Sequence, residues 1–295
     1  MKIINIVLLI FVFIFGIFQM RKSSAIIKTE WFKDLSNNEK RLTTSKIKEN
    51  WKACRYDSAK NICRGIEVVS VGDSSVTLRA SITIASITLL PTAKLTVDYT
   101  VLSDGSLVVN THADMSRNTY DSTRERTPLP RFGFEFKMPE ENERLRYFGK
   151  GEVESYIDKC LAAKKGVFET TVTEHFEPYI RPQENMAHTD TEWVAVSNLT
   201  GHGLYAFSTG NSFSFNCSHY TAKQLTETAH DYELVPLKET VVNIDYRHAG
   251  IGSASCGPVL KEEYRLSEES IDFEFRIKPA FINDLDPFEE FGRKF

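Results

Sequence analysis

The stretch HAGIGSASCGP, residues 248–258, contains a histidine, a cysteine and three glycines. A phosphate-binding loop would need a lysine and a following helix, and neither is present. A nucleophilic cysteine would need a base and an electropositive setting. His248 lies near Cys256 in the sequence, but no motif places the two side chains together. The stretch therefore predicts a shaped wall of a pocket, in which glycines permit unusual backbone angles.

A second set of polar side chains lies in RPQENMAHTDTEW, residues 181–193. Such clusters are usually solvated loops, but one this varied could also lock two domains together or contact a sugar. The candidates for these contacts are Arg181, Glu184, Asn185 and His188. Epimerase chemistry needs a histidine acid and a glutamate base across a sugar ring. The nearest candidate set is His188 with Glu184 or Glu192.

Two shorter patterns have plain structural interpretations. Gly149 and Gly151 flank a lysine, and without a third glycine they predict a tight turn rather than a phosphate site. Asp245 and Arg247 occupy alternate positions of an expected strand and so point the same way. We expect these two side chains to pair with each other.

The five cysteines and seven histidines show no metal-site spacing, because neither C-x-x-C nor a histidine pair at i, i+4 occurs. No metal site is predicted on this chain. Cys54 and Cys63 could form a disulfide in an oxidising compartment, or all five cysteines could remain unpaired. Asn198 and Asn216 fit the glycosylation sequon, which matters only in a eukaryotic host.

Residues 1–25 have the pattern of a secretory signal peptide. Lys2 precedes an almost continuous apolar run from Ile3 to Phe18, and the small residues 23–25 suit a cleavage site. We expect a secreted or exported protein. The alternative is a membrane anchor formed by residues 3–20, although the apolar run is shorter than the roughly 20 residues of a spanning helix. A net charge of −4, without clustered Lys and Arg, argues against a nucleic-acid partner.

The elements that must position these residues are mostly strands. Hydrophobic alternation begins at Gly65, and Asp104-Gly105 supplies the turn of a hairpin. Thr221 and Gln224 form the capping box of one helix. We expect a poorly patterned segment at 26–64, an antiparallel β-sandwich with few short helices at 65–280, and an acidic, aromatic tail at 281–295. Further strands are expected at 132–136, 167–172, 193–196, 203–208, 240–246 and 271–277.

Several segments together resemble the C-terminal domain 5, or small chain, of bacterial-type β-galactosidases of glycoside hydrolase family 2. Their order and spacing match over about residues 129–266. The family commonly has proline where Glu152 stands and glycine where Met186 stands, so the local geometry there is expected to differ. The segments that carry the resemblance are LPRFGFEF (129–136), FGKGEVESYIDK (148–159), YIRPQEN (179–185), FSFNCSHYTAKQLTETAHDYEL (213–234) and NIDYRHAGIGSASCGPVLKEEYRL (243–266).

The resemblance implies a large sandwich of the galactose mutarotase-like kind. It also implies that the loop carrying His248, Gly252, Ser255 and Cys256 forms the substrate side of an active site, where tryptophan or cysteine holds the position of Cys256. The family's catalytic carboxylates and magnesium belong to a barrel of roughly 250 residues. The strand pattern leaves no room for that barrel here, so no catalytic residue or cofactor is expected on this chain.

The expected function is thus that of a β-galactosidase small chain, which completes the active site of a separate barrel chain acting on terminal β-galactosides such as lactose. The alternatives are a free-standing carbohydrate-binding or aldose-epimerase-like module, or a non-catalytic remnant.

Overall fold

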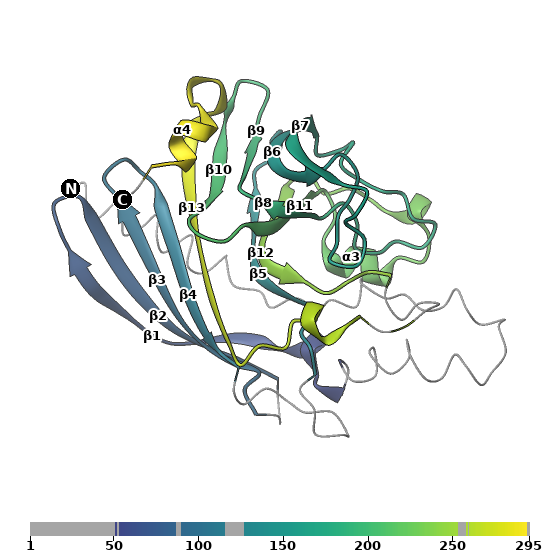
Figure 1. Cartoon of the computed structure of the whole chain (residues 1–295), viewed down its shortest axis with the longest axis horizontal. Coiled ribbons are helices and arrows are strands. Elements are labelled where there is room, and N and C mark those ends of the chain that lie inside the picture. The colour runs from purple at the N-terminus through teal and green to yellow at the C-terminus, as the bar shows by residue number, and fades with distance from the viewer. Residues whose placement is uncertain are drawn as a thin grey trace.

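The computed structural model describes residues 51, 53–86, 90–115, 127–252, 258 and 260–293 (Figure 1). Within these residues the chain forms two antiparallel sheets, one of nine strands and one of four. The predicted antiparallel β-sandwich is therefore confirmed. No helix of the described residues is long and apolar enough to cross a membrane.

The nine-stranded sheet has the order β1-β2-β3-β4-β13-β10-β9-β6-β7. Its last strand in sequence, β13, lies between β4 and β10 and joins the first hairpins to the later strands (Figure 1). The strands are β1 (Lys60–Val71), β2 (Ser75–Ala85), β3 (Ala93–Leu102), β4 (Leu107–Asp114), β6 (Arg144–Gly151), β7 (Lys164–Thr171), β9 (Trp193–Ser197), β10 (His202–Ser208) and β13 (Ser270–Phe281).

The four-stranded sheet has the order β5-β12-β11-β8. Three of its strands are buried along nearly their whole length, so polar residues such as Glu135, Asn216 and Asp245 are buried together with apolar ones. Its strands are β5 (Arg131–Met138), β8 (His188–Thr191), β11 (Phe213–Ser218) and β12 (Thr240–His248).

Short helices occupy the connections and the C-terminal segment. The predicted capping box is present at the start of α3, where Gln224 N donates to Thr221 Oγ1 at 3.1 Å. The hairpin turn is present as well, with Gly105 at φ 84° in the left-handed region. The helices are η3 (Tyr56–Ser58), α3 (Ala222–Glu227), η4 (Asp231–Glu233), η5 (Glu262–Tyr264), η6 (Ile282–Asp284) and α4 (Pro287–Phe291).

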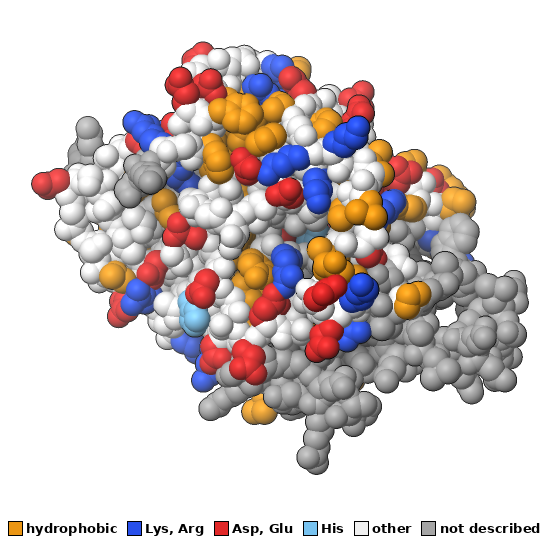
Figure 2. All heavy atoms as spheres, viewed as in Figure 1, with side chains coloured by type: hydrophobic (Ala, Val, Ile, Leu, Met, Phe, Trp, Pro, Cys, Tyr) orange, Lys and Arg blue, Asp and Glu red, His pale blue; other side chains and the backbone are white. Residues whose placement is uncertain are grey.

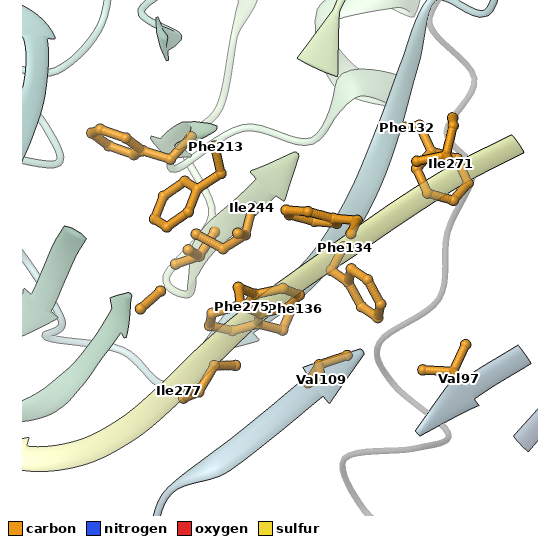
Figure 3. Packing of buried hydrophobic residues seen from close by; sticks show 14 of the residues in the cluster. Val97, Val109, Phe132, Phe134, Phe136, Phe213, Ile244, Ile271, Phe275 and Ile277 are labelled. Carbon is orange, nitrogen blue, oxygen red and sulfur yellow. The ribbon is translucent and has the colours of Figure 1, made fainter. Parts of the chain in front are cut away.

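The main core lies between the two sheets. Phe134 of β5 meets Phe275 of β13 edge to face, with ring centroids 5.0 Å apart. Side chains from both sheets fill the space around this pair (Figure 3). The large sheet thus holds β5 and β12 in place, and these two strands carry the polar cluster described below.

The segment predicted as a tail is folded onto the outside of the large sheet. Ile282, Leu285 and Phe291 pack against a buried cluster that includes Trp193 and Tyr205. The sequence pattern missed this packing because the segment alternates acidic and aromatic residues over a short length. At the N-terminal end of the sandwich, the first strand, β1, begins at Lys60, before the expected start of the domain at residue 65.

The predicted turn at Gly149 and Gly151 is wrong, because both residues belong to β6. A Cβ on Gly149 would come within 2.4 Å of Thr191 Oγ1, and one on Gly151 within 2.5 Å of the Tyr147 hydroxyl. The two glycines therefore allow close approach of neighbouring strands and side chains. Their role is packing inside a sheet, which spacing alone does not reveal.

Candidate functional site

The base of the loop that follows β12 lies over a buried ionic cluster. Arg131, the first residue of β5, stands opposite His248, the last residue of β12. Its guanidinium binds the Asp245 carboxylate through Nε (3.2 Å) and Nη2, and its Nη1 donates to Glu184 Oε2 at 3.2 Å. All four side chains are buried. One arginine therefore ties two strands and the 181–188 segment together.

Arg131 and the two carboxylates in this cluster stabilise one another. Burial opposes the charge of Arg131, but Asp245 and Glu184 raise its pKa above the ordinary value. Burial would raise the pKa of Asp245, yet Arg131 and His248 hold it below the ordinary value. Nε2 of His248 donates to Asp245 Oδ2 at 2.7 Å. The predicted pairing of Asp245 with Arg247 is wrong, because Arg247 contacts Glu268 instead.

The backbone that leaves this cluster is held step by step. Ala249 N donates to the carbonyl of Pro130 at 2.8 Å, and Ile251 and Gly252 donate to the Asp158 carboxylate. Of the predicted loop residues, His248 and Gly252 therefore have defined positions. Ser255 and Cys256 lie outside the described residues.

The polar cluster at 181–188 is largely internal. Glu184, Asn185 and His188 are buried, whereas Arg181 and Gln183 are partly exposed. The Asn185 side chain accepts from Glu177 N at 3.2 Å and donates to the carbonyl of Gln183 at 2.9 Å. The solvated-loop interpretation is thus wrong for these three residues. Met186 between them has φ 51°, a conformation that favours the glycine expected there.

His188 forms a pair with His175, their Nε2 atoms 2.8 Å apart. Nδ1 of His175 donates to the carbonyl of Cys217 at 2.9 Å, and Nδ1 of His188 lies 2.7 Å from the carbonyl of Lys150. Burial lowers the pKa of His175 to about 4 and that of His188 to about 3. Both imidazoles are therefore neutral at physiological pH.

The epimerase set is not assembled in this structure. His188 is engaged with His175, Glu184 with Arg131, and Glu192 with Lys165 at 2.6 Å. Each candidate acid or base has a separate partner, and His188 has no exposed surface. This arrangement does not favour acid/base chemistry across a sugar ring.

The remaining predicted residues have simple surroundings. Cys54 is buried whereas Cys63 is exposed, and the structure does not join them by a disulfide. Asn216 is buried within β11 and donates to the carbonyl of Asn185 at 2.5 Å, so a glycan at this position would not fit the fold. Asn198 lies partly exposed in the β9–β10 turn. No group of three or more His, Cys, Asp or Glu among the described residues could hold a metal ion.

Reasoning from sequence missed Arg131, Asp158 and His175 as parts of the site. Arg131 follows a proline at a strand start, and Asp158 lies in a segment without period-two alternation. The only signal for Arg131 and Asp158 was membership of the matching segments 129–136 and 148–159, and His175 lies in none of the matching segments. Acidic and basic side chains are interspersed on the face shown in Figure 2, so the charge distribution on that face does not mark a site.

Comparison with known proteins supports the family resemblance that these segments carry. Residues 17–277 match the family described as the beta galactosidase small chain. A β-galactosidase from Staphylococcus xylosus is 38% identical over 234 residues, which are 79% of this chain and 22% of that enzyme. A β-galactosidase from Actinobacillus pleuropneumoniae is 37% identical over 239 residues, which are 81% of this chain and 22% of that enzyme. The chain thus spans about a fifth of the length of these relatives.

Among solved structures, a GalM/aldose epimerase homologue from C. elegans is similar at a TM-score of 0.36 and 11% identity, over 75% of this chain and 70% of that one. A galactose mutarotase related enzyme from Lactobacillus acidophilus is similar at a TM-score of 0.33 and 7% identity, over 74% of this chain and 71% of that one.

Proposed function

This chain belongs to the β-galactosidase small-chain family, and we propose that it completes the substrate side of an active site whose catalytic carboxylates lie on a separate barrel chain. The reaction is hydrolysis of terminal β-galactosides such as lactose. Retaining hydrolysis needs two carboxyl groups about 5 Å apart, one as acid/base and one as nucleophile. In this proposal the barrel chain supplies that pair and its magnesium, and the small chain supplies the wall against the leaving sugar.

The observation that carries the proposal is the ionic cluster beneath the loop. Arg131, Asp245, Glu184 and His248 are buried and engaged with one another. Groups that are buried and paired in this way are poor candidates for proton transfer to a sugar, because they are shielded from the surface. They are well suited to hold the backbone after His248 in one place. The cluster therefore supports a positioning role for this end of the domain.

The wall itself works through shape rather than charge. The loop leaves β12 beside buried Tyr156, whose ring centroid lies 5.7 Å from that of His248. A cysteine at position 256 would offer less stacking surface to a sugar than the tryptophan found in other members. A looser hold on the leaving sugar follows, and with it a higher KM for disaccharides than in a tryptophan-bearing relative.

The proposal also covers the cellular setting. The signal-like residues 1–25 support export of the chain, with residues 3–20 as an anchor if they are retained. The barrel chain would then have to reach the same compartment. Partly exposed Asn198 is the sequon that glycosylation could modify if the host is eukaryotic.

The test is complementation. The full chain is mixed with the part of the Staphylococcus xylosus enzyme that lies outside the region matched here, and hydrolysis of a chromogenic β-galactoside is measured. We expect activity in the mixture and none in either component alone. Absence of activity in a mixture of two folded components would sink the small-chain proposal. A complementary measurement recovers the tagged chain from its own host and assays the co-purified material.

A further inference from the structure

We propose that Asp158 is a positioning residue that fixes the backbone of residues 250–252, at the start of the loop after β12. Its importance for substrate rests on the proposed function, but its action on the backbone does not. Asp158 is not in β5, β8, β11 or β12. It lies in the turn between Tyr156 and Lys159, which pair with each other as an isolated bridge.

The two carboxylate oxygens of Asp158 bind two consecutive backbone amides. Ile251 N donates to Oδ1 at 3.1 Å, and Gly252 N donates to Oδ2 at 3.0 Å. Consecutive N–H groups that converge in this way form a small anion-binding concavity. Hydrogen bonds to an ionised acceptor are about twice as strong as neutral ones. The carboxylate is therefore matched in charge and in geometry to this piece of backbone.

The contact is also close in space. A Cβ on Gly250 would lie 2.1 Å from Asp158 Oδ2 and 2.2 Å from its Cγ. Only a glycine lets the backbone come so near the carboxylate. Ile251 is buried and packs with Tyr156 and Ala187 in a small apolar cluster. Three successive loop residues thus contact the same turn, Gly250 by close approach and Ile251 and Gly252 by backbone hydrogen bonds.

The turn that carries Asp158 is itself firmly held. Ser155 N donates to the carbonyl of Ala187 at 2.7 Å, and Lys159 N donates to that of Tyr156 at 2.9 Å. Buried Glu154 accepts from Met186 N at 2.9 Å and from the Tyr179 hydroxyl at 2.5 Å, and it contacts Lys159. Asp158 therefore transfers the rigidity of this turn to the loop.

The Arg131–Asp245 cluster holds the loop at His248, and Asp158 holds it at Ile251 and Gly252. The second anchor is the one nearer in sequence to Ser255 and Cys256. Loss of the first anchor would disturb the sandwich itself, because it joins two strands. Loss of the second anchor would release the backbone of residues 250–252 and leave the sheets intact. This difference makes Asp158 the residue at which loop position can be tested separately from folding.

The first experiment measures backbone amide exchange in the full chain. Asp158→Ala is compared with the wild type, with Asp158→Asn, and with Asp73→Asn as a control in the exposed β1–β2 turn. In Asp158→Ala we expect the amides of Ile251 and Gly252 to exchange about tenfold faster, because both acceptors are lost. Ala249, bonded to Pro130, should not change. Asp158→Asn keeps the shape and one acceptor oxygen, so it should show an intermediate effect and remain folded.

The second experiment uses the complemented enzyme and separates KM from kcat. Asp158→Ala should raise KM for a disaccharide substrate by about three- to tenfold while kcat stays within about twofold, because the catalytic groups are untouched. Asp73→Asn should change neither constant. Unchanged exchange at Ile251 and Gly252 in folded Asp158→Ala and Asp158→Asn would overturn the anchoring role. Faster exchange with an unchanged KM would overturn the role in substrate positioning. If the wild-type mixture is inactive, the proposed function fails while the exchange result still decides the anchoring.

Discussion

At the scale of single residues, this domain buries ionisable groups in two ways. Arg131, Asp245 and Glu184 are buried as charges and stabilise one another. His175 and His188 are buried as neutral rings whose Nε2 atoms lie 2.8 Å apart. The first group holds a loop base, and the second fills the interior beside Tyr147 and Phe215. Acid should therefore affect the two groups differently.

The histidine pair predicts a loss of stability in mild acid. The folded pKa values of about 4 and about 3 lie below the ordinary value of 6.5. Between these values the unfolded chain binds protons that the folded chain does not, so the free energy of unfolding falls as pH falls. We expect a full contribution above pH 6.5 and a progressive decrease toward pH 4. Urea unfolding measured at half-unit steps from pH 7.5 to 4.5 checks this.

A variant identifies the source of that pH dependence. His188→Gln removes one of the two titrating rings, so the stability curve should be flatter between pH 6.5 and 4 even if the variant is less stable at pH 7.5. His230→Gln is the matched control, because His230 is partly exposed and pairs with Glu233 near the surface. A slope for His188→Gln as steep as that of the wild type would contradict the assignment.

At the scale of elements, close approach of strands decides several glycine positions. Gly133 of β5 lies against Asp245 of β12, and a Cβ there would be 2.2 Å from Asp245 Oδ1 and 2.5 Å from its Cα. Because the second contact is with backbone, no rotamer change can relieve it. The glycine thus permits both the strand pairing and the approach of Asp245 to Arg131.

We therefore expect Gly133→Ala to destabilise the domain by about 1–3 kcal/mol, the usual range for overpacking of an interior. Gly65→Ala is the matched control, because Gly65 also lies in a strand and a Cβ there would meet nothing within 4 Å. Chemical denaturation of both variants measures the difference. Equal stability of the two would show that β5 and β12 can separate without penalty.

Strands with alternating side chains could be predicted from the sequence, because period-two burial follows directly from strand geometry. Next to the expected Asp104-Gly105 hairpin turn, β3 shows this alternation of buried and more exposed residues. By contrast, β6 and β11 were missed. Glycines interrupt the first, and the second is short and buried on both faces. The site could be predicted only in part, because His248 and Glu184 were named before folding was known. Arg131 contacts these two residues, and Asp158 contacts the loop backbone, only in the folded chain.

At the scale of the whole molecule, the C-terminal segment closes the outer face of the large sheet. Arg276 of β13 is buried and donates to Glu290 of α4 at 2.5 Å. Lys278 contacts the same carboxylate at 3.0 Å. Together with the apolar contacts to Trp193 and Tyr205, these bonds make α4 part of the domain rather than an appendage (Figure 1).

Deletion of residues 282–293 should therefore be costly. Removing the carboxylate beside buried Arg276 is expected to lower the free energy of unfolding by about 3–5 kcal/mol. It also uncovers apolar surface over Trp193, so binding of a hydrophobic dye and self-association should increase. Glu289→Gln, an exposed change on the same helix, is the control. A monomeric deletion variant with wild-type stability would show that α4 is dispensable.

The place of β13 also has a consequence for how the protein is made. Residues 270–281 leave the ribosome after all the other strands that the structure describes, yet they lie in the middle of the nine-stranded sheet. Until then, β4 and β10 each present an unpaired edge, and the two halves of the sheet have no strand between them. The growing polypeptide can therefore close its largest sheet only after residues 270–281 have been made. During translation, the nascent chain is expected to depend on chaperones that shield such edges.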